Sequence, residues 1–290
     1  MPAPIPAFVN PKSGSAEAAL AALRADPRFE ARPTEPSQIA AMVREEAARG
    51  TPRVLVSGGD GTVAQAAGAA AEAGIELAVL PGGTLNHFAR DFGLPLDDPA
   101  AALDVAATGT PRPVDLAYVE DRVILNTSAV GAYVNFVRTR ERLERWMGYH
   151  LASFVAAVRV WLNVRGFVVA FRASDGTTRR YVTPLVFVGV GERVLDRAGL
   201  GSRVPNGSSA LHVLVVCETT RARVAALAFG ALVRGLDALV KTDALDAYLV
   251  DECTVTMRRP WGNVSIDGEL ARLRAPLTYR LRRGAVHIVG

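Results

Sequence analysis

Residues 54–65 read Val-Leu-Val-Ser-Gly-Gly-Asp-Gly-Thr-Val-Ala-Gln, and this stretch decides the fold. An apolar run that meets a cluster of glycines predicts a strand, a tight turn over 58–62 and the start of a helix. Glycines adopt backbone angles closed to other residues and lack the Cβ atom that would keep a ligand away. The helix start offers unpaired N–H groups, so the turn suits a phosphate, or it is a plain tight connection.

Strands and helices alternate on both sides of this stretch. The expected elements are strands at Ile5–Val9 and Ile75–Leu80 and helices after Ser15, after Ser37 and over Val63–Ala73. The alternation predicts a Rossmann-like α/β domain over residues 1–113, with a parallel sheet and helices on both faces. In such a domain the ligand lies beyond the carboxyl ends of the strands, where the loops that leave the strands converge.

The pattern changes near Pro111-Arg112-Pro113. Downstream, short runs rich in valine and aromatic residues predict strands at Val114–Val119, Val123–Asn126, Phe167–Arg172, Arg180–Val190, Leu211–Cys217, Cys253–Arg258 and Val264–Ile266. Two helical stretches, 141–164 and 222–241, interrupt them. We therefore expect a second domain over residues 114–290, mostly an antiparallel β-sandwich, whose last strand or tail is free to return to the first domain.

The composition is that of a globular chain, with 50% hydrophobic and 21% charged residues. The net charge of +4 and the isoelectric point near 9.4 are compatible with anionic membrane surfaces or phosphorylated ligands. No long run of like charges appears, so most of this charge is interpreted as solvated surface. No nucleic-acid partner is expected.

Cysteine usage and hydropathy point to a cytoplasmic protein. Cys217 and Cys253 are the only cysteines, and we interpret both as buried thiols of a reducing compartment. The N-terminus lacks the features of a signal peptide, and no uncharged apolar stretch reaches the roughly 18 residues of a membrane span. Any membrane contact would be peripheral, at the inner face. The four histidines have no metal-ligand spacing, so no metal site is assigned.

Four motifs resemble those of one enzyme family. In chain order they are Val9-Asn10-Pro11-Lys12-Ser13-Gly14, Gly58-Gly59-Asp60-Gly61-Thr62, Pro81-Gly82-Gly83-Thr84-Leu85-Asn86 and Asp267-Gly268-Glu269. Together they resemble the diacylglycerol kinase catalytic-domain family of lipid kinases. The resemblance implies a two-domain enzyme with ATP and Mg²⁺, which transfers the γ-phosphoryl group to a hydroxyl of a diacylglycerol-like or sphingoid lipid in an interdomain cleft. The lipid partner would lie at a membrane surface, and a homodimer is left open.

The resemblance also assigns the nucleotide to the N-terminal loops. The matching positions are Asn10, Lys12, Ser13 and Gly14, then Thr34, then Gly58, Gly59, Gly61 and Thr62, and finally Gly83, Thr84 and Asn86. Backbone N–H groups, hydroxyls and a cation are what phosphoryl transfer asks of a protein. Lys12 and Thr34 equally suit ordinary loop residues, whereas Thr84 and Asn86 are better supported, with a plain turn as the alternative.

Three acidic residues are the candidates for the catalytic step. Beside phosphates, Asp60 is repulsive unless it binds a metal or caps a helix, and both roles stay open. The resemblance implies that Glu269 is the general base that accepts the proton of the lipid hydroxyl, with Asp267 beside it. The alternative for Asp267-Gly268 is a hairpin turn, because Asp-Gly between apolar segments is a strong turn signal.

Three departures from the family pattern keep other functions open. Ala64-Gln65 stands where the family has Asn-Glu, Gly189-Val190-Gly191 where it often has Gly-Asn-Gly, and residues 207–210 where it has the Asp-Asp-Gly of a Mg²⁺ site. One alternative is therefore a catalytically impaired nucleotide- or lipid-binding protein. Another is an NAD kinase, because that group shares the Gly-Gly-Asp-Gly-Thr motif.

The helix expected over residues 141–164 carries an apolar stripe at roughly helical spacing, formed by Trp146, Leu151, Phe154, Val155, Val158, Trp161 and Leu162. Several arginines lie nearby in the sequence. We interpret the stripe as a core-packing face. The alternatives are an element that enters a membrane interface and a wall of an acyl-chain groove.

Overall fold

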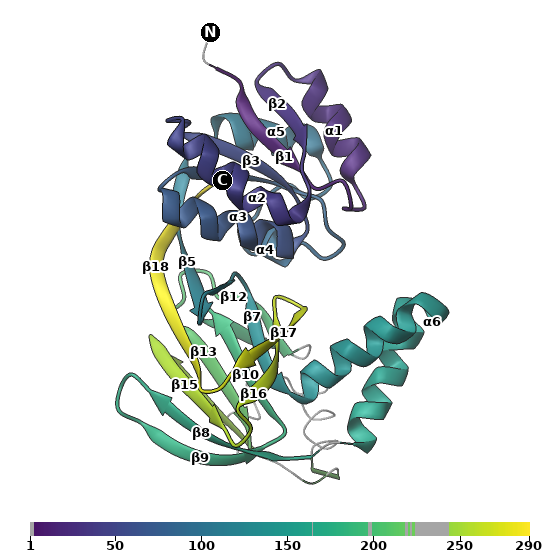
Figure 1. Cartoon of the computed structure of the whole chain (residues 1–290), viewed down its shortest axis with the longest axis vertical. Coiled ribbons are helices and arrows are strands. Elements are labelled where there is room, and N and C mark those ends of the chain that lie inside the picture. The colour runs from purple at the N-terminus through teal and green to yellow at the C-terminus, as the bar shows by residue number, and fades with distance from the viewer. Residues whose placement is uncertain (1–2, 164, 197–198, 218–219, 221, 224–243) are drawn as a thin grey trace. The chain divides into compact units, whose positions relative to one another are not determined.

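The computed structural model describes residues 3–290 except 164, 197–198, 218–219, 221 and 224–243 (Figure 1). The chain forms two compact units, which we call the first unit, residues 1–116 with 282–290, and the second unit, residues 117–281. Both boundaries fall inside strands. Within the described part of the chain, no helix combines the length and the apolarity needed to span a bilayer.

The first unit is built on a parallel sheet. Its strands are β1 (Ile5–Val9), β2 (Phe29–Pro33), β3 (Arg53–Gly58) and β4 (Glu76–Pro81), in the order β2-β1-β3-β4. The last part of β18 (Leu277–Val289) lies beside β4, also in parallel. The Rossmann-like α/β fold is therefore confirmed. The strand β2 escaped the sequence analysis because Phe-Glu-Ala-Arg-Pro is short, charged and not alternating.

Helices cover both faces of this sheet: α1 (Ala16–Ala25), α2 (Pro36–Ala48), α3 (Asp60–Ala73), the short α4 (His87–Asp91) and α5 (Pro99–Thr108). Leu23 of α1, Leu103 of α5 and Leu55 of β3 share one apolar core. The alternation of strand side chains turns Val54 and Val56 to the opposite face. There the buried residues of α2 and α3 are mostly small or β-branched.

The second unit holds two antiparallel sheets that enclose one core. The first contains β5 (Pro111–Val119), β6 (Arg122–Ile124), β8 (Phe167–Ala173), β9 (Thr178–Thr183), β15 (Glu252–Met257) and the first part of β18. The second has the order β14 (Leu245–Val250), β13 (Leu211–Val216), β10 (Leu185–Val190), β7 (Thr127–Gly131), β16 (Trp261–Ile266) and β17 (Glu269–Arg274). Phe171 of the first sheet and Val188 of the second belong to the same cluster, so the antiparallel β-rich class is confirmed.

The expected strand over 180–190 is wrong as a single element. It is two strands, because Pro184 lies between them and proline has no N–H group for a ladder. The strand β9 pairs with β8 in the first sheet, whereas β10 pairs with β13 and β7 in the second. A small hairpin, β11 (Arg193–Asp196) and β12 (Gly199–Arg203), comes next in the chain.

The long helix α6 (Ala132–Leu162) begins well before the position expected from the sequence. It bends back on itself at Gly148, whose φ of 73° is open to glycine and strained for other residues (Figure 1). The interpretation of its apolar stripe as core is wrong for Trp146 and Phe154, which are 85% and 66% exposed. The helix expected over 222–241 lies almost entirely outside the described residues. Cys253 is buried as expected, but Cys217 is only half-buried.

Candidate active site

The candidate site begins where the strands of the first unit end. The strand β1 lies between β2 and β3, so the chain changes direction across the sheet at this point, which is where α/β proteins bind ligands. Val9 pairs with Ser57, and Gly58 pairs with Pro81. The three predicted loops therefore leave β1, β3 and β4 at the same edge of the sheet.

Glycines let the second and third loops touch through their backbones. A Cβ atom on Gly83 would lie 2.6 Å from Cα of Gly59, a distance that real side chains do not reach. A Cβ on Gly82 would lie 3.1 Å from the nitrogen of Gly58, and the Gly82 N–H group donates to the Gly58 carbonyl at 3.0 Å. The close approach of the two loops therefore requires glycine at 83, and a side chain at 82 would push them slightly apart.

The first loop is bonded to the other two. The buried Asn10 donates from Nδ2 to Oγ1 of Thr62 at 3.0 Å, and its Oδ1 accepts from the Lys12 N–H group at 2.9 Å. Ser15 was expected to cap α1, but its hydroxyl instead donates to the Gly82 carbonyl at 3.2 Å. One asparagine and one serine thus hold all three loops together. Ser15 is a site residue that the sequence analysis missed, because a serine before a helix looks like a cap.

Asp60 ties the start of α3 to α4. Its Oδ1 accepts from the Phe88 N–H group at 3.0 Å, and its Oδ2 accepts from the His87 N–H group at 3.1 Å. The capping role left open by the sequence is therefore observed, but the capped helix is α4 rather than the one that Asp60 begins. Whether Asp60 also binds a metal stays a prediction.

The N-terminus of α3 is free to bind an anion. The N–H groups of Thr62 and Val63 donate to the Gly59 carbonyl. Those of Asp60 and Gly61 bond to no other residue of the described chain. Two N–H donors at the positive end of a 14-residue helix are a candidate site for a phosphate. The fully buried Ser57 hydroxyl, just before this turn, also lacks a partner in the described part of the protein.

The other residues predicted to bind the nucleotide form mostly local contacts. Asn86 has φ of 49°, and its amide bonds both the N–H group and the carbonyl of Gly83 at 2.8 Å, so it shapes the third loop. Thr34 is buried, with its hydroxyl on the Arg32 carbonyl. Lys12 forms an exposed ion pair with Glu35 at 2.7 Å. The Ser13 hydroxyl donates to the Asn10 carbonyl of its own loop, and among the described residues Thr84 has no side-chain hydrogen bond to the other two loops.

In the second unit, Asp267 is a structural anchor. Its carboxylate accepts from the N–H groups of Leu125, Asn126 and Thr127 at 2.8–2.9 Å. Asp267 and Gly268 have φ of 47° and 88° and connect β16 to β17, where Ile266 pairs with Glu269. The hairpin turn left open by the sequence is therefore present.

Glu269 is the available carboxylate of this hairpin. It is exposed at the first position of β17, and its carboxylate forms no hydrogen bond or ion pair with another described residue. A carboxylate with this freedom can accept a proton from a substrate, whereas Asp267 is already occupied by backbone donors. The turn and the general base are thus compatible roles of neighbouring residues.

Two arginines near Asp267, the buried Arg193 and the half-buried Arg203, escaped the sequence analysis. Arg193 donates to the carbonyls of Val190 and Asn126 at 3.1 Å, and Arg203 donates to that of Leu125 at 2.7 Å. A Cβ atom on Gly189 would lie 2.9 Å from Cγ of Arg193, so this glycine makes room for the arginine. An arginine in an ordinary strand carries no sequence signal of such a role.

The described residues contain no group of three or more His, Cys, Asp or Glu side chains placed to hold a metal ion. The segment that replaces the family's Asp-Asp-Gly is held by a protein contact instead. The Ser208 N–H group donates to the Glu192 carboxylate at 2.8 Å, and hydrogen bonding by Ser208 lowers the pKa of Glu192. The protein alone therefore offers no preformed cage for Mg²⁺ in the part that is described.

Comparison with known proteins identifies the class. Residues 4–119 match the family described as "Diacylglycerol kinase catalytic domain". This region contains all three loops and every residue of the anion site. Residues 4–119 are thus similar to the catalytic domain of the class of lipid kinases that the motifs of the chain predicted.

Individual relatives extend the similarity along the chain. The chain is 27% identical over 281 residues to a diacylglycerol kinase of Mycobacterium tuberculosis, covering 92% of this chain and 89% of that protein. Over 111 residues it is 41% identical to a Pseudomonas aeruginosa protein named "Probable lipid kinase YegS-like", covering 37% and 36% of the two chains. The crystal structure of a diacylglycerol kinase from Bacillus anthracis has a TM-score of 0.70 at 22% identity, covering 99% and 96%. The two-unit fold is therefore that of known structures.

Proposed function

We propose that this protein is an ATP-dependent lipid kinase that phosphorylates a hydroxyl of a diacylglycerol-like or sphingoid lipid at a membrane surface. The observation that supports the proposal most is the pair of free N–H groups at Asp60 and Gly61, at the edge where three loops are bonded together. Such a cradle suits the phosphates of a nucleotide.

Each group of the site has a role in this proposal. The N-terminus of α3 binds the phosphates, and Asp60 fixes the third loop beside it. Thr84, exposed on that loop, is placed to contact the ribose or the base. Mg²⁺ is assigned to the nucleotide phosphates, since Mg²⁺ commonly binds through substrate phosphates with few protein ligands.

In the proposed reaction Glu269 accepts the proton of the lipid hydroxyl. The hydroxyl oxygen forms a bond to the γ-phosphorus while the bond between that phosphorus and the β,γ-bridging oxygen breaks, and ADP leaves. Because the base must reach the hydroxyl in the transition state, an exposed and unpaired carboxylate suits the role. Asp267 acts through position, since it holds the backbone at residues 125–127.

The test is phosphoryl transfer from γ-labelled ATP with Mg²⁺ to a panel of acceptors: diacylglycerol, monoacylglycerol, a sphingoid base, ceramide, phosphatidylglycerol and NAD. We expect label in one lipid class and none in NAD. Labelled NAD alone would replace the proposal with an NAD kinase. ATP binding without transfer to any acceptor would identify a nucleotide-binding protein that lacks catalysis, a result in line with the unusual Ala64-Gln65.

A further inference from the structure

The helix α6 forms an exposed arm of the second unit. Only Val134, Val137, Ala152 and Ala156 are buried along its 31 residues. The bend at Gly148 brings its two halves back toward each other (Figure 1). We call residues 132–162 with Arg165 the arm.

Several large apolar side chains of the arm are exposed to solvent. Trp146, Leu151 and Phe154 are 85%, 54% and 66% exposed, and Trp161 is 44% exposed. Aromatic side chains of this size are costly to leave in water, so an exposed group of them marks a binding surface.

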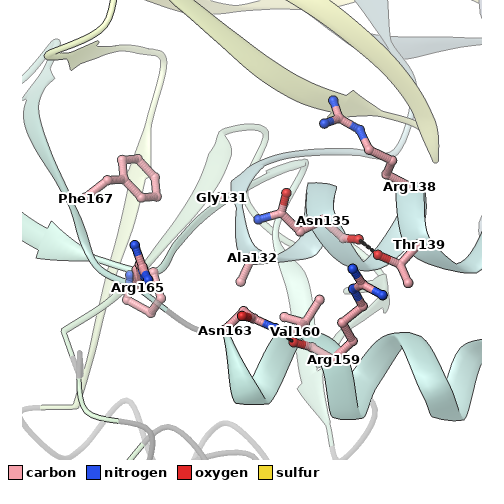
Figure 2. Close-up of a pocket in the computed structure, with 11 residues that line it drawn as sticks. Gly131, Ala132, Asn135, Arg138, Thr139, Arg159, Val160, Asn163, Arg165 and Phe167 are labelled. Atoms are coloured by element: carbon pink, nitrogen blue, oxygen red, sulfur yellow. Dashed lines mark hydrogen bonds between the residues drawn. The ribbon is translucent and has the colours of Figure 1, made fainter.

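Arginines of the same arm line a cavity of about 380 Å³. Arg138 comes from the first half of α6 and Arg159 from the second, and Arg165 lies just after the helix (Figure 2). None of the three forms an ion pair with a carboxylate in the described ranges. Three arginines in the lining of one cavity give it a positive charge, which attracts an anionic group such as a phosphate.

A second cavity adjoins the first and is also lined by arginines. It has a volume of about 470 Å³ and shares Gly131, Asn135 and Phe167 with the first cavity. Arg258, Arg259 and the half-exposed Trp261 line it. The lining of the two adjoining cavities therefore contains five arginines, Arg138, Arg159, Arg165, Arg258 and Arg259, together with Trp261. An arrangement of basic and aromatic side chains is typical of proteins that lie in the interface of an anionic membrane.

We propose that the arm docks on an anionic phospholipid bilayer, with Trp146 and Phe154 entering the interface and the arginine cavity receiving a lipid phosphate. Charge complementarity favours this occupant over a second copy of the chain. The helix α6 contains five arginines and two glutamates, so a symmetric pairing of two arms would set arginines against arginines. The inference deepens the proposed lipid kinase function. Membrane binding is measured without nucleotide. The docking of the arm can therefore fail while the kinase activity holds, and the kinase activity can fail while the docking holds.

The experiment is sedimentation of the full-length protein with phosphatidylcholine vesicles, with or without phosphatidylglycerol. We expect binding to the anionic vesicles that weakens as salt rises. The cavity variant Arg138→Gln/Arg159→Gln/Arg165→Gln should lose about a hundredfold in partitioning, the size expected for three basic residues at an anionic surface.

A matched control separates the cavity from overall charge. Arg24, Arg112 and Arg122 are exposed and form no ion pair with a described residue, so Arg24→Gln/Arg112→Gln/Arg122→Gln removes the same charge elsewhere. This variant should bind within about threefold of the wild type. An equal loss in both variants would show attraction by net charge alone and overturn the cavity assignment.

The apolar half of the proposal has its own control and readout. Trp146→Ser/Phe154→Ser should lose most of the binding, whereas Val182→Ser/Leu249→Ser, at exposed positions on strands, should keep it. Brominated lipid should quench the tryptophan emission of the wild-type protein. This readout does not depend on the folding of any variant. Emission that is blue-shifted and shielded from acrylamide before vesicles are added would overturn the proposal, because another segment, a second copy or a protein partner would already cover the arm.

Discussion

The two units each contain an Asp-Gly segment, Asp60-Gly61 and Asp267-Gly268. Both aspartates bind backbone N–H groups, but the first segment starts a helix and the second leads into a strand. Asp60 and Asp267 both accept backbone N–H groups from a distant segment, two for Asp60 and three for Asp267. Asp60 begins a helix whose first two N–H groups bond to no other described residue, whereas Asp267 precedes a strand that begins with Glu269, whose carboxylate is unbonded in the described chain. The aspartates therefore fix the loops, and the groups beside them are left for chemistry.

The strongest test of this difference is Glu269→Gln. If Glu269 is the base and Asp267 only the anchor, the substitution should lower kcat by about 10²–10⁴-fold while ATP affinity and stability stay unchanged. Steady-state kinetics on the lipid acceptor and calorimetric titration with ATP measure the two effects. Glu17→Gln, at an exposed helical position, is the control. Unchanged kcat in Glu269→Gln would move the base elsewhere.

Asp267→Ala should act on stability. Three N–H groups lose a charged acceptor, so we expect the free energy of unfolding in urea to fall by about 3 kcal/mol. Asp60→Ala, which frees two N–H groups, should cost about 2 kcal/mol and also weaken ATP binding. The exposed Asp121→Ala serves as control. Equal stability of all three variants would show that the aspartates do not anchor the loops.

Gly83→Ala tests the contact between the second and third loops. The added Cβ atom meets Cα of Gly59 at 2.6 Å, so the loops must separate, at a cost of about 1–3 kcal/mol. Gly14→Ala meets nothing within 4 Å and should leave the free protein as stable as before. Weaker ATP binding in Gly14→Ala would then report contact with the nucleotide itself. Thermal unfolding with and without ATP separates these effects.

The smallest effect concerns Glu46, a carboxylate held by side chains rather than backbone N–H groups. Burial opposes its ionisation, but hydrogen bonds from Arg32 and Thr51 outweigh this and lower its pKa from 4.5. A lowered pKa stabilises the fold above the unfolded value and loses that effect as the pH falls. Glu46→Gln should therefore cost about 1 kcal/mol near pH 7 and progressively less below about pH 4.5. Urea unfolding across this range is the measurement, and a difference that grows in acid would contradict the assignment.

Local sequence signals predicted the part of the site that depends on local geometry. The glycine clusters at 58–59 and 82–83 marked turns, and at Gly58 and Gly83 an added Cβ atom would meet Thr62 and Gly59. The partners of the aspartates were not predictable, because Asp267 bonds to residues more than 100 positions away. Periodicity in α6 showed an apolar stripe but not its surroundings, since a core face and a membrane-binding face have the same spacing.

The central claim is that the N-terminus of α3 binds the phosphates of ATP. The most direct measurement is the backbone amide spectrum of the labelled protein during titration with ATP, ADP and adenosine. We predict that the signals of Asp60 and Gly61 shift strongly with ATP and ADP and little with adenosine, because only the nucleotides carry phosphates. Saturable ATP binding that leaves both signals unmoved would contradict the claim and place the nucleotide elsewhere in the protein.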